Sequence, residues 1–85
     1  MDLQVPSWLK YRQGELEPAG ERCYKVSAPV SDPAYIRVRQ RDGQWQAAVA
    51  DAADGPDLRA TEPVFPRESD AWSAAFELYR SARIY

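Results

Sequence analysis

Three arginines at alternate positions, Arg37, Arg39 and Arg41, are the side chains of this sequence that are best suited to bind a partner. Alternate residues of a β-strand point to one face of a sheet, so an extended backbone would set the three guanidinium groups in a row. Such a row can contact phosphates and stack with bases. It can also contact a protein partner, or form a solvated surface whose aliphatic stems cover the strands. The sequence leaves these three alternatives open.

The row lies in a predicted β-hairpin that covers residues 35–51 and closes at Asp42-Gly43, a dipeptide favoured where both turn positions take positive φ angles. The expected pairs are Arg41 with Gln44, Gln40 with Trp45, Val38 with Ala47, and Ile36 with Val49. A slip of one residue would move every side chain to the other face, so the register is strongly specified.

The two faces of this hairpin differ in chemistry. The apolar face carries Ile36, Val38, Trp45, Ala47 and Val49. The other face carries the candidate binding residues, which are Tyr35, Arg37, Arg39, Arg41, Gln44 and Gln46. We expect the apolar face to pack on the core and the arginine face to meet solvent or a partner.

The remaining reactive residue types argue against an enzyme. The chain has no histidine, which excludes Cys–His pairs, Ser–His–Asp triads and His-ligated zinc. Cys23 is the single cysteine and is expected to be a buried or half-buried thiol. Asp51, Asp54 and Asp57 lack the spacing of an EF-hand and predict a solvated acidic loop. We predict no catalytic residue, metal, cofactor or small-molecule ligand.

Length and charge restrict the class further. Eighty-five residues predict one small domain, and the net charge of −2 disfavours a protein whose main task is to bind nucleic acid. The charge is uneven: residues 35–49 hold three Arg and one Asp (+2), whereas residues 50–70 hold two Arg and six acids (−4). No signal peptide and no apolar run of membrane-spanning length is evident, so we expect a cytoplasmic protein. Nine Arg against two Lys indicates a GC-rich bacterial source.

The N-terminal segment has two interpretations. Residues 7–12 favour either a short helix, capped by Ser7 and ended at Gly14, or an extended arm. Its large apolar side chains are Trp8, Leu9 and Tyr11. They extend the core if the segment folds back, and otherwise form an exposed partner site.

Further along the chain, turn and strand patterns alternate. Residues 17–20 predict a turn, residues 22–27 a short strand, and residues 28–33, with two prolines, a connection. Residues 58–65 predict a third strand, and Pro63 places it at an edge of the sheet.

Residues 66–85 predict the one long helix, with its body starting near Ser69 as N-cap. Arg80 and Arg83 near its end complement the helix dipole. Its expected buried stripe is Ala71, Trp72, Ala75, Phe76, Tyr79 and Ala82.

These elements predict a single α+β domain over residues 1–85. A small antiparallel sheet of three or four strands packs against one C-terminal α-helix, in the order β-β-β-α. Residues 1–20 are an arm or short helix, residues 21–66 the sheet, and residues 67–85 the helix.

The hairpin and helix resemble the AP2/ERF-type DNA-binding domain of plants and the AP2-like domains of integrases over residues 35–80. The matching positions of the family's YRGVRQR…GKWAAEIRD pattern are Tyr35, Val38-Arg39-Gln40-Arg41, Gly43, Trp45, Ala47, Val49 and Asp51. Phe65 and Ala71 fall on its helix entry. The resemblance implies a three-stranded sheet with a helix, and DNA contacts from Arg39 and Arg41. The family's glycine is Arg37 here, and its outward Glu and Arg on the second strand are Ala48 and Ala50.

The sequence therefore predicts a non-enzymatic protein-interaction or accessory module that uses the arginine face. Its expected partner is another protein or a second copy of the chain, without a membrane. The alternative is a nucleic-acid-binding domain that uses the same face.

Overall fold

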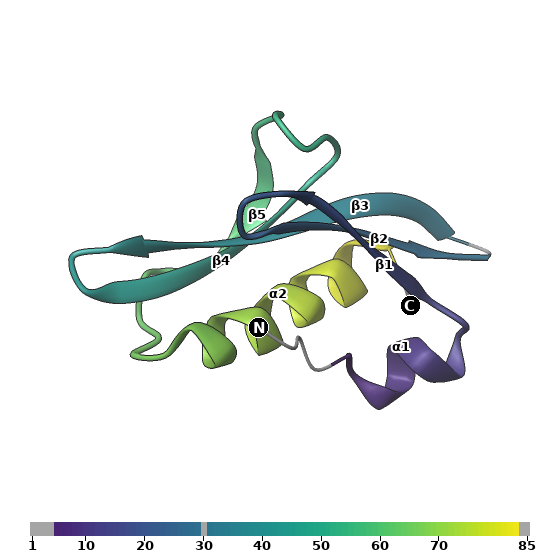
Figure 1. Cartoon of the computed structure of the whole chain (residues 1–85), viewed down its shortest axis with the longest axis horizontal. Coiled ribbons are helices and arrows are strands. Elements are labelled where there is room, and N and C mark those ends of the chain that lie inside the picture. Colours follow the sequence, from purple (N-terminus) through teal and green to yellow (C-terminus); the bar gives the residue numbers. More distant parts are fainter. Residues whose placement is uncertain (1–4, 30, 84–85) are drawn as a thin grey trace.

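One antiparallel sheet and one long helix make up the main layers of the protein. The computed structural model describes residues 5–29 and 31–83 and has an α+β architecture in which a five-stranded sheet packs against the C-terminal helix (Figure 1). The strands follow one another across the sheet in chain order. The elements are α1 (Ser7–Tyr11), β1 (Glu15–Gly20), β2 (Cys23–Ala28), β3 (Ser31–Arg41), β4 (Gln44–Ala50), β5 (Asp57–Ala60) and α2 (Glu68–Arg83).

The β3–β4 hairpin agrees with the sequence in both turn and register. Asp42 and Gly43 take φ angles of 53° and 81°, as a tight two-residue hairpin turn requires. Arg41 pairs with Gln44, and the pairing continues without a shift to Tyr35 and Ala50. The predicted division into two faces is confirmed. We call the side that packs on α2 the inner face and the opposite side the outer face.

The sheet is larger than the sequence predicted, with five strands among the described residues instead of three or four. Residues 17–20, expected as a turn, belong to β1, and residues 31–33, expected as a connection, begin β3. Prolines in both segments caused the error. Pro18 lies in an edge strand, and Pro33 lies beside a register shift at the end of β2. Both positions tolerate a residue without an N–H group.

Helix α2 closes the inner face. It begins at Glu68, so Ser69 lies inside the helix and does not cap it. The buried residues of α2 are Ala71, Trp72, Ala75, Phe76 and Tyr79, as the helical period predicted, and Ala82 is half-buried. They form one cluster with inner-face residues of the sheet such as Ile36, Val38 and Val49. Residues 84–85 of the predicted helix lie outside the described residues.

The N-terminal segment folds back as a short helix, the first of its two interpretations. Pro6 occupies the N-cap of α1, without a side-chain cap from Ser7. Leu9 is fully buried and Trp8 stacks on Tyr79, with ring centroids 6.3 Å apart. Tyr11, by contrast, is 90% exposed and adds nothing to the core.

Gly14 allows the close approach of α1 and the following strand. A Cβ atom at this position would lie 2.3 Å from Leu9 Cδ1, which is far inside normal contact distance. α1 ends at Tyr11, three residues before the predicted stop at Gly14. Gly14 instead provides room for the buried Leu9 side chain, because a Cβ atom there would clash with it.

The predicted third strand is split into two parts. β5 covers only Asp57–Ala60, at the edge of the sheet as Pro63 predicted. The chain then leaves the sheet and returns at Phe65, which pairs with Trp45 through N–O distances of 2.7 and 3.1 Å. In the part of the chain that the structure describes, we find no helix with the length and apolar character needed to cross a membrane.

Candidate functional site

The six candidate binding residues lie side by side on the outer face. Tyr35, Arg37, Arg39 and Arg41 come from β3, while Gln44 and Gln46 come from β4. The register sets Arg39 opposite Gln46 and Arg41 opposite Gln44. The hairpin thus forms the row that alternation predicted. This row is not simply solvated, however, because other parts of the chain bind two of its arginines.

Arg37 holds the loop between β4 and β5 against the outer face. Its Nε and Nη2 atoms donate to Asp57 Oδ1 at 3.1 and 2.8 Å. Its Nη1 atom donates to the carbonyl of Ala53 at 3.0 Å, and Nη2 also donates to the carbonyl of Gly55. The side chain is only 17% exposed. All three guanidinium nitrogens therefore serve the fold.

Arg39 is the second arginine that donates a hydrogen bond to the Asp57 carboxylate. Its Nη2 atom donates to Asp57 Oδ2, and its Nε donates to Gln46 Oε1 at 3.2 Å. The Gln46 amide in turn donates to the carbonyl of Thr61 at 2.9 Å, and Gln46 is buried. One carboxylate, two guanidinium groups and one amide thus connect β3, β4 and β5 across the outer face.

Three small side chains on the outer face are buried. Ala48, Ala50 and Cys23 belong to the outer face by register and are buried. Burial raises the pKa of the Cys23 thiol, and the Arg37 guanidinium opposes this rise only in part. The expectation of a buried thiol is confirmed. The thiol is therefore protonated and poorly nucleophilic at neutral pH.

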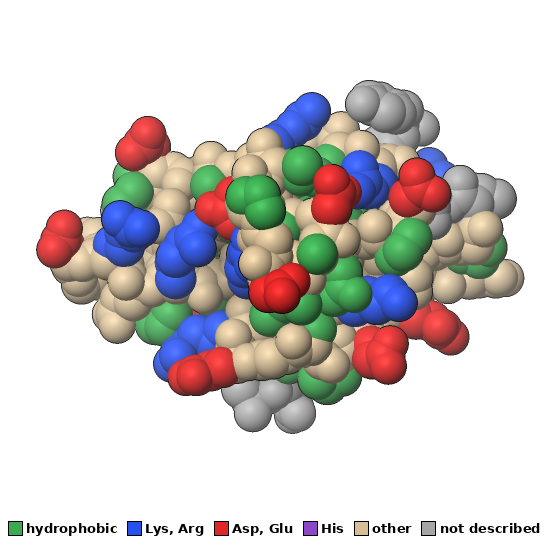
Figure 2. Space-filling model, turned by 90° about the horizontal axis from the view of Figure 1, so that it is seen from above, with side chains coloured by type: hydrophobic (Ala, Val, Ile, Leu, Met, Phe, Trp, Pro, Cys, Tyr) green, Lys and Arg blue, Asp and Glu red, His purple; other side chains and the backbone are tan. Residues whose placement is uncertain are grey.

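Four of the six candidate residues remain accessible. Arg41 and Gln44 are exposed, and Tyr35 and Arg39 are half-buried. Next to them lies a shallow hollow of about 540 Å³, whose charged lining residues are Arg39, Arg41, Asp42, Asp57 and Glu62. Three acids against two arginines give this hollow no positive charge. In Figure 2, which views the molecule from above the sheet, basic and acidic side chains are intermixed.

The acidic loop is only partly solvated, which corrects the sequence expectation. Asp57 is 24% exposed and bridges two arginines. Asp51 pairs with Arg83 at the end of α2, while Asp54 is exposed. Opposite charges far apart in the chain account for the difference, because folding brings them into contact. Among the described residues, no group of three or more potential ligands is arranged to hold a metal ion.

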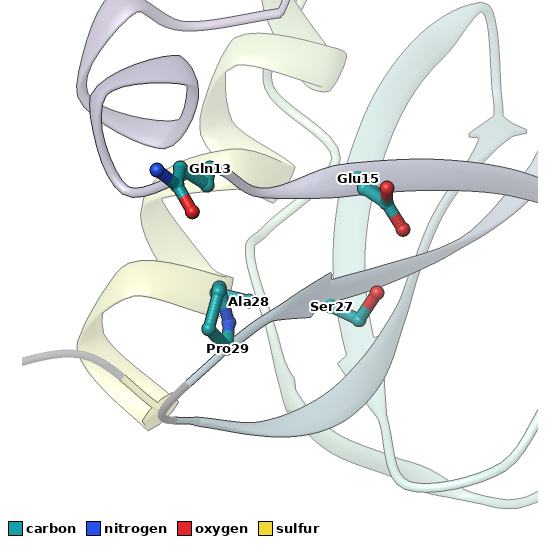
Figure 3. A pocket seen from close by; sticks show the side chains of 5 residues that line it. All are labelled: Gln13, Glu15, Ser27, Ala28 and Pro29. Carbon is teal, nitrogen blue, oxygen red and sulfur yellow. The ribbon is translucent and has the colours of Figure 1, made fainter.

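A second hollow, of about 380 Å³, lies between the start of β1 and the end of β2 (Figure 3). Its lining residues are Gln13, Glu15, Ser27, Ala28 and Pro29. Glu15 and Ser27 are cross-strand partners. The lining contains one carboxylate and no basic side chain, and the Glu15 carboxylate and the Ser27 hydroxyl form no hydrogen bond with each other.

Asp57 and Thr61 are the residues of this region that sequence reasoning missed. Thr61 donates its backbone N–H to the carbonyl of Ala47 at 2.9 Å and accepts the Ala47 N–H on its hydroxyl at 3.0 Å. The only signal for Asp57 was its opposite charge to the arginine row. That signal does not select Asp57 over Asp51 or Asp54.

No protein-family model matches the chain, and no curated protein or solved structure matches it. The resemblance to AP2-like domains therefore stays a prediction.

Proposed function

We propose that the chain is a small non-enzymatic protein-interaction module that uses the open part of its outer face. The contact residues are Arg41, Gln44 and Tyr35, with Arg39 at the border of the covered part. The observation that carries this proposal is the Asp57 carboxylate, which pairs with Arg37 and Arg39 and offsets one of their two positive charges. What remains exposed is a mixed-charge surface with a tyrosine and an arginine.

This composition favours a protein partner over nucleic acid. Tyrosine and arginine are enriched in protein interfaces, whose overall polarity is close to that of the remaining surface. A nucleic-acid site needs several cations free to replace the counterions of the phosphates. Here Arg37 is engaged with the loop, and the hollow beside Arg41 also carries acids.

The test combines titration with affinity capture. Labelled protein is titrated with a short DNA duplex and with single-stranded RNA, at low and at physiological salt. We expect no salt-sensitive amide shifts in residues 35–46. Steep loss of such shifts with salt would instead support nucleic-acid binding and overturn the proposal.

Capture from cell extract then compares the wild type with Arg41→Glu and with a matched control, Lys10→Glu. Both residues are exposed, and both variants reverse one positive charge. Captured proteins should be lost with Arg41→Glu and retained with Lys10→Glu. Identical captured sets for the two variants would exclude the outer face as the contact surface. Sedimentation of the purified chain decides whether the partner is a second copy.

A further inference from the structure

A separate hollow of about 350 Å³ lies at the end of the sheet that extends beyond the first turn of α2 (Figure 1). Its lining residues are Glu21, Arg22, Val38, Arg39, Gln40 and Trp45. Gln40 and Trp45 are paired across the hairpin and belong to the inner face. The indole of Trp45 is half-buried and so is accessible from this hollow.

Arg22 places a guanidinium group over that indole. Its Cζ atom lies 5.2 Å from the centroid of the Trp45 ring. Its Nη1 is 3.2 Å from Glu21 Oε1, and its Nε is 3.7 Å from Glu68 Oε1. An aromatic face with carboxylates at its rim is the arrangement by which proteins recognise organic cations. In the free protein the recognised cation is a side chain of the chain itself.

The site keeps a surplus of negative charge once Arg22 leaves it. Glu21 and Glu68 both lie beside the guanidinium of Arg22. Arg39 is the other cation that lines the hollow, and its guanidinium is directed to Asp57 on the outer face. Glu21 is 88% exposed and the Arg22 side chain 46% exposed, so a second cation can approach. The net charge of −2 on the whole chain also favours a basic partner.

We propose that this hollow is a binding site for an arginine side chain of a partner peptide, and that Arg22 occupies it in the free protein. The incoming guanidinium stacks on Trp45 and pairs with Glu21 and Glu68 while Arg22 moves into solvent. The competition lowers the apparent affinity, because only molecules with a displaced Arg22 are competent to bind. Arg39 lines the hollow and also borders the outer-face surface, but the residues proposed to bind the guanidinium, Trp45, Glu21 and Glu68, do not belong to that surface.

The test follows the indole N–H signal of Trp45 by NMR during titration with acetyl-Gly-Arg-Gly-amide. We expect a saturable shift at Trp45 and Gln40. The matched probe acetyl-Gly-citrulline-Gly-amide has nearly the same shape without the charge and should give none. A saturable shift with both probes would show that charge is not recognised, and no shift with either would exclude the site.

The decisive variant is Arg22→Asn. Arg22 has a φ angle of 51°, a conformation that asparagine tolerates well. Removing the internal competitor should tighten binding of the arginine probe about fivefold, which corresponds to about 1 kcal/mol. Weaker binding in Arg22→Asn would overturn the proposal, because it would make Arg22 part of the surface that the partner contacts.

The carboxylates are tested by Glu21→Gln combined with Glu68→Gln. Glu68 also accepts a hydrogen bond from Trp72 Nε1 at 2.9 Å, and glutamine keeps an acceptor for it. Binding of the probe should fall at least about fivefold, whereas the charge-matched control Glu15→Gln with Glu17→Gln should leave it unchanged. Equal losses of binding in both double variants would show that only the net charge of the protein matters, and would contradict a defined site.

Discussion

The inner and outer faces of the sheet are both partly covered, but by interactions of different kinds. On the inner face, α2 and α1 bury a continuous apolar cluster that includes Leu9, Phe76 and Tyr79. On the outer face, the β4–β5 loop is held by hydrogen bonds from Arg37 and by the Asp57 carboxylate. Apolar burial scales with area and has no direction, whereas the outer layer depends on a few directed bonds. The first is a distributed form of stabilisation, and the second is concentrated in the side chains of Arg37, Arg39 and Asp57.

The largest expected effect breaks the inner face. Phe76→Ala removes a ring that is 1% exposed and leaves a cavity, which should lower the free energy of unfolding by about 3–5 kcal/mol. In a domain of this size that change can unfold the protein. Urea denaturation measures it. Val64→Ala, at a position 61% exposed, is the control and should change stability by less than about 0.5 kcal/mol.

The outer face should respond next most strongly, to a single polar substitution. Arg37→Ala leaves Asp57 Oδ1 and the carbonyls of Ala53 and Gly55 without their donor, while Arg39 remains bound to Asp57 Oδ2. We expect a loss of about 2–3 kcal/mol in denaturation, with faster hydrogen exchange in residues 51–57. The matched control Arg41→Ala removes an exposed arginine from the same row and should cost less than about 0.5 kcal/mol. Equal effects from the two variants would mean that the arginines are interchangeable and the anchor does not exist.

The reactivity of the Cys23 thiol measures whether the outer face has become exposed. The raised pKa and the burial of its thiol predict slow reaction with a disulfide reagent such as DTNB near pH 8. The rate should increase in Arg37→Ala, because the side chain paired with Cys23 across β2 and β3 is removed, and remain low in Arg41→Ala. A rate in Arg37→Ala equal to that of the wild type would show that the sheet itself, and not the Arg37 side chain, protects the thiol.

The smallest expected effect on stability comes from the hydroxyl of Tyr79 on the inner face. Tyr79 is fully buried, and its hydroxyl has no hydrogen-bond partner among the described residues. Tyr79→Phe should therefore change stability at neutral pH by less than about 1 kcal/mol, in contrast to Phe76→Ala. Burial of the ring accounts for its stabilising effect without the hydroxyl. A loss above about 2 kcal/mol would indicate a hydrogen bond that the geometry does not contain.

The same residue gives a pH dependence with a defined sign. Burial raises the pKa of the Tyr79 hydroxyl above its ordinary value of 10.0, and Arg83 opposes this only in part. Above about pH 10 the unfolded chain loses this proton while the folded chain retains it, so the unfolding free energy falls as the pH rises. Denaturation midpoints between pH 8 and 11 should fall less steeply for Tyr79→Phe than for the wild type. Identical slopes would contradict the shift.

Local patterns in the sequence were sufficient to predict the hairpin and the long helix. The Asp42-Gly43 turn sets the register, and alternation then assigns every side chain of β3 and β4 to a face. The helical period likewise identified the buried side of α2. The same local rules failed at β1 and at the start of β3, where prolines at an edge and beside a register shift resembled the signature of a turn.

The sequence by itself determined which side chains share a face, because the periods of strands and helices depend only on backbone geometry. Only the tertiary structure decided whether a face is open. Arg37 and Arg41 occupy equivalent positions in the same row, yet one binds a loop that begins eight residues after the hairpin turn and the other is exposed. That difference arises because Asp57 pairs with two arginines that are distant in the sequence. The sequence alone gives no reason to choose Asp57 for this pairing over an acidic neighbour such as Asp54. The physical reason is that charge attraction selects by distance in space, and the folded chain alone sets that distance.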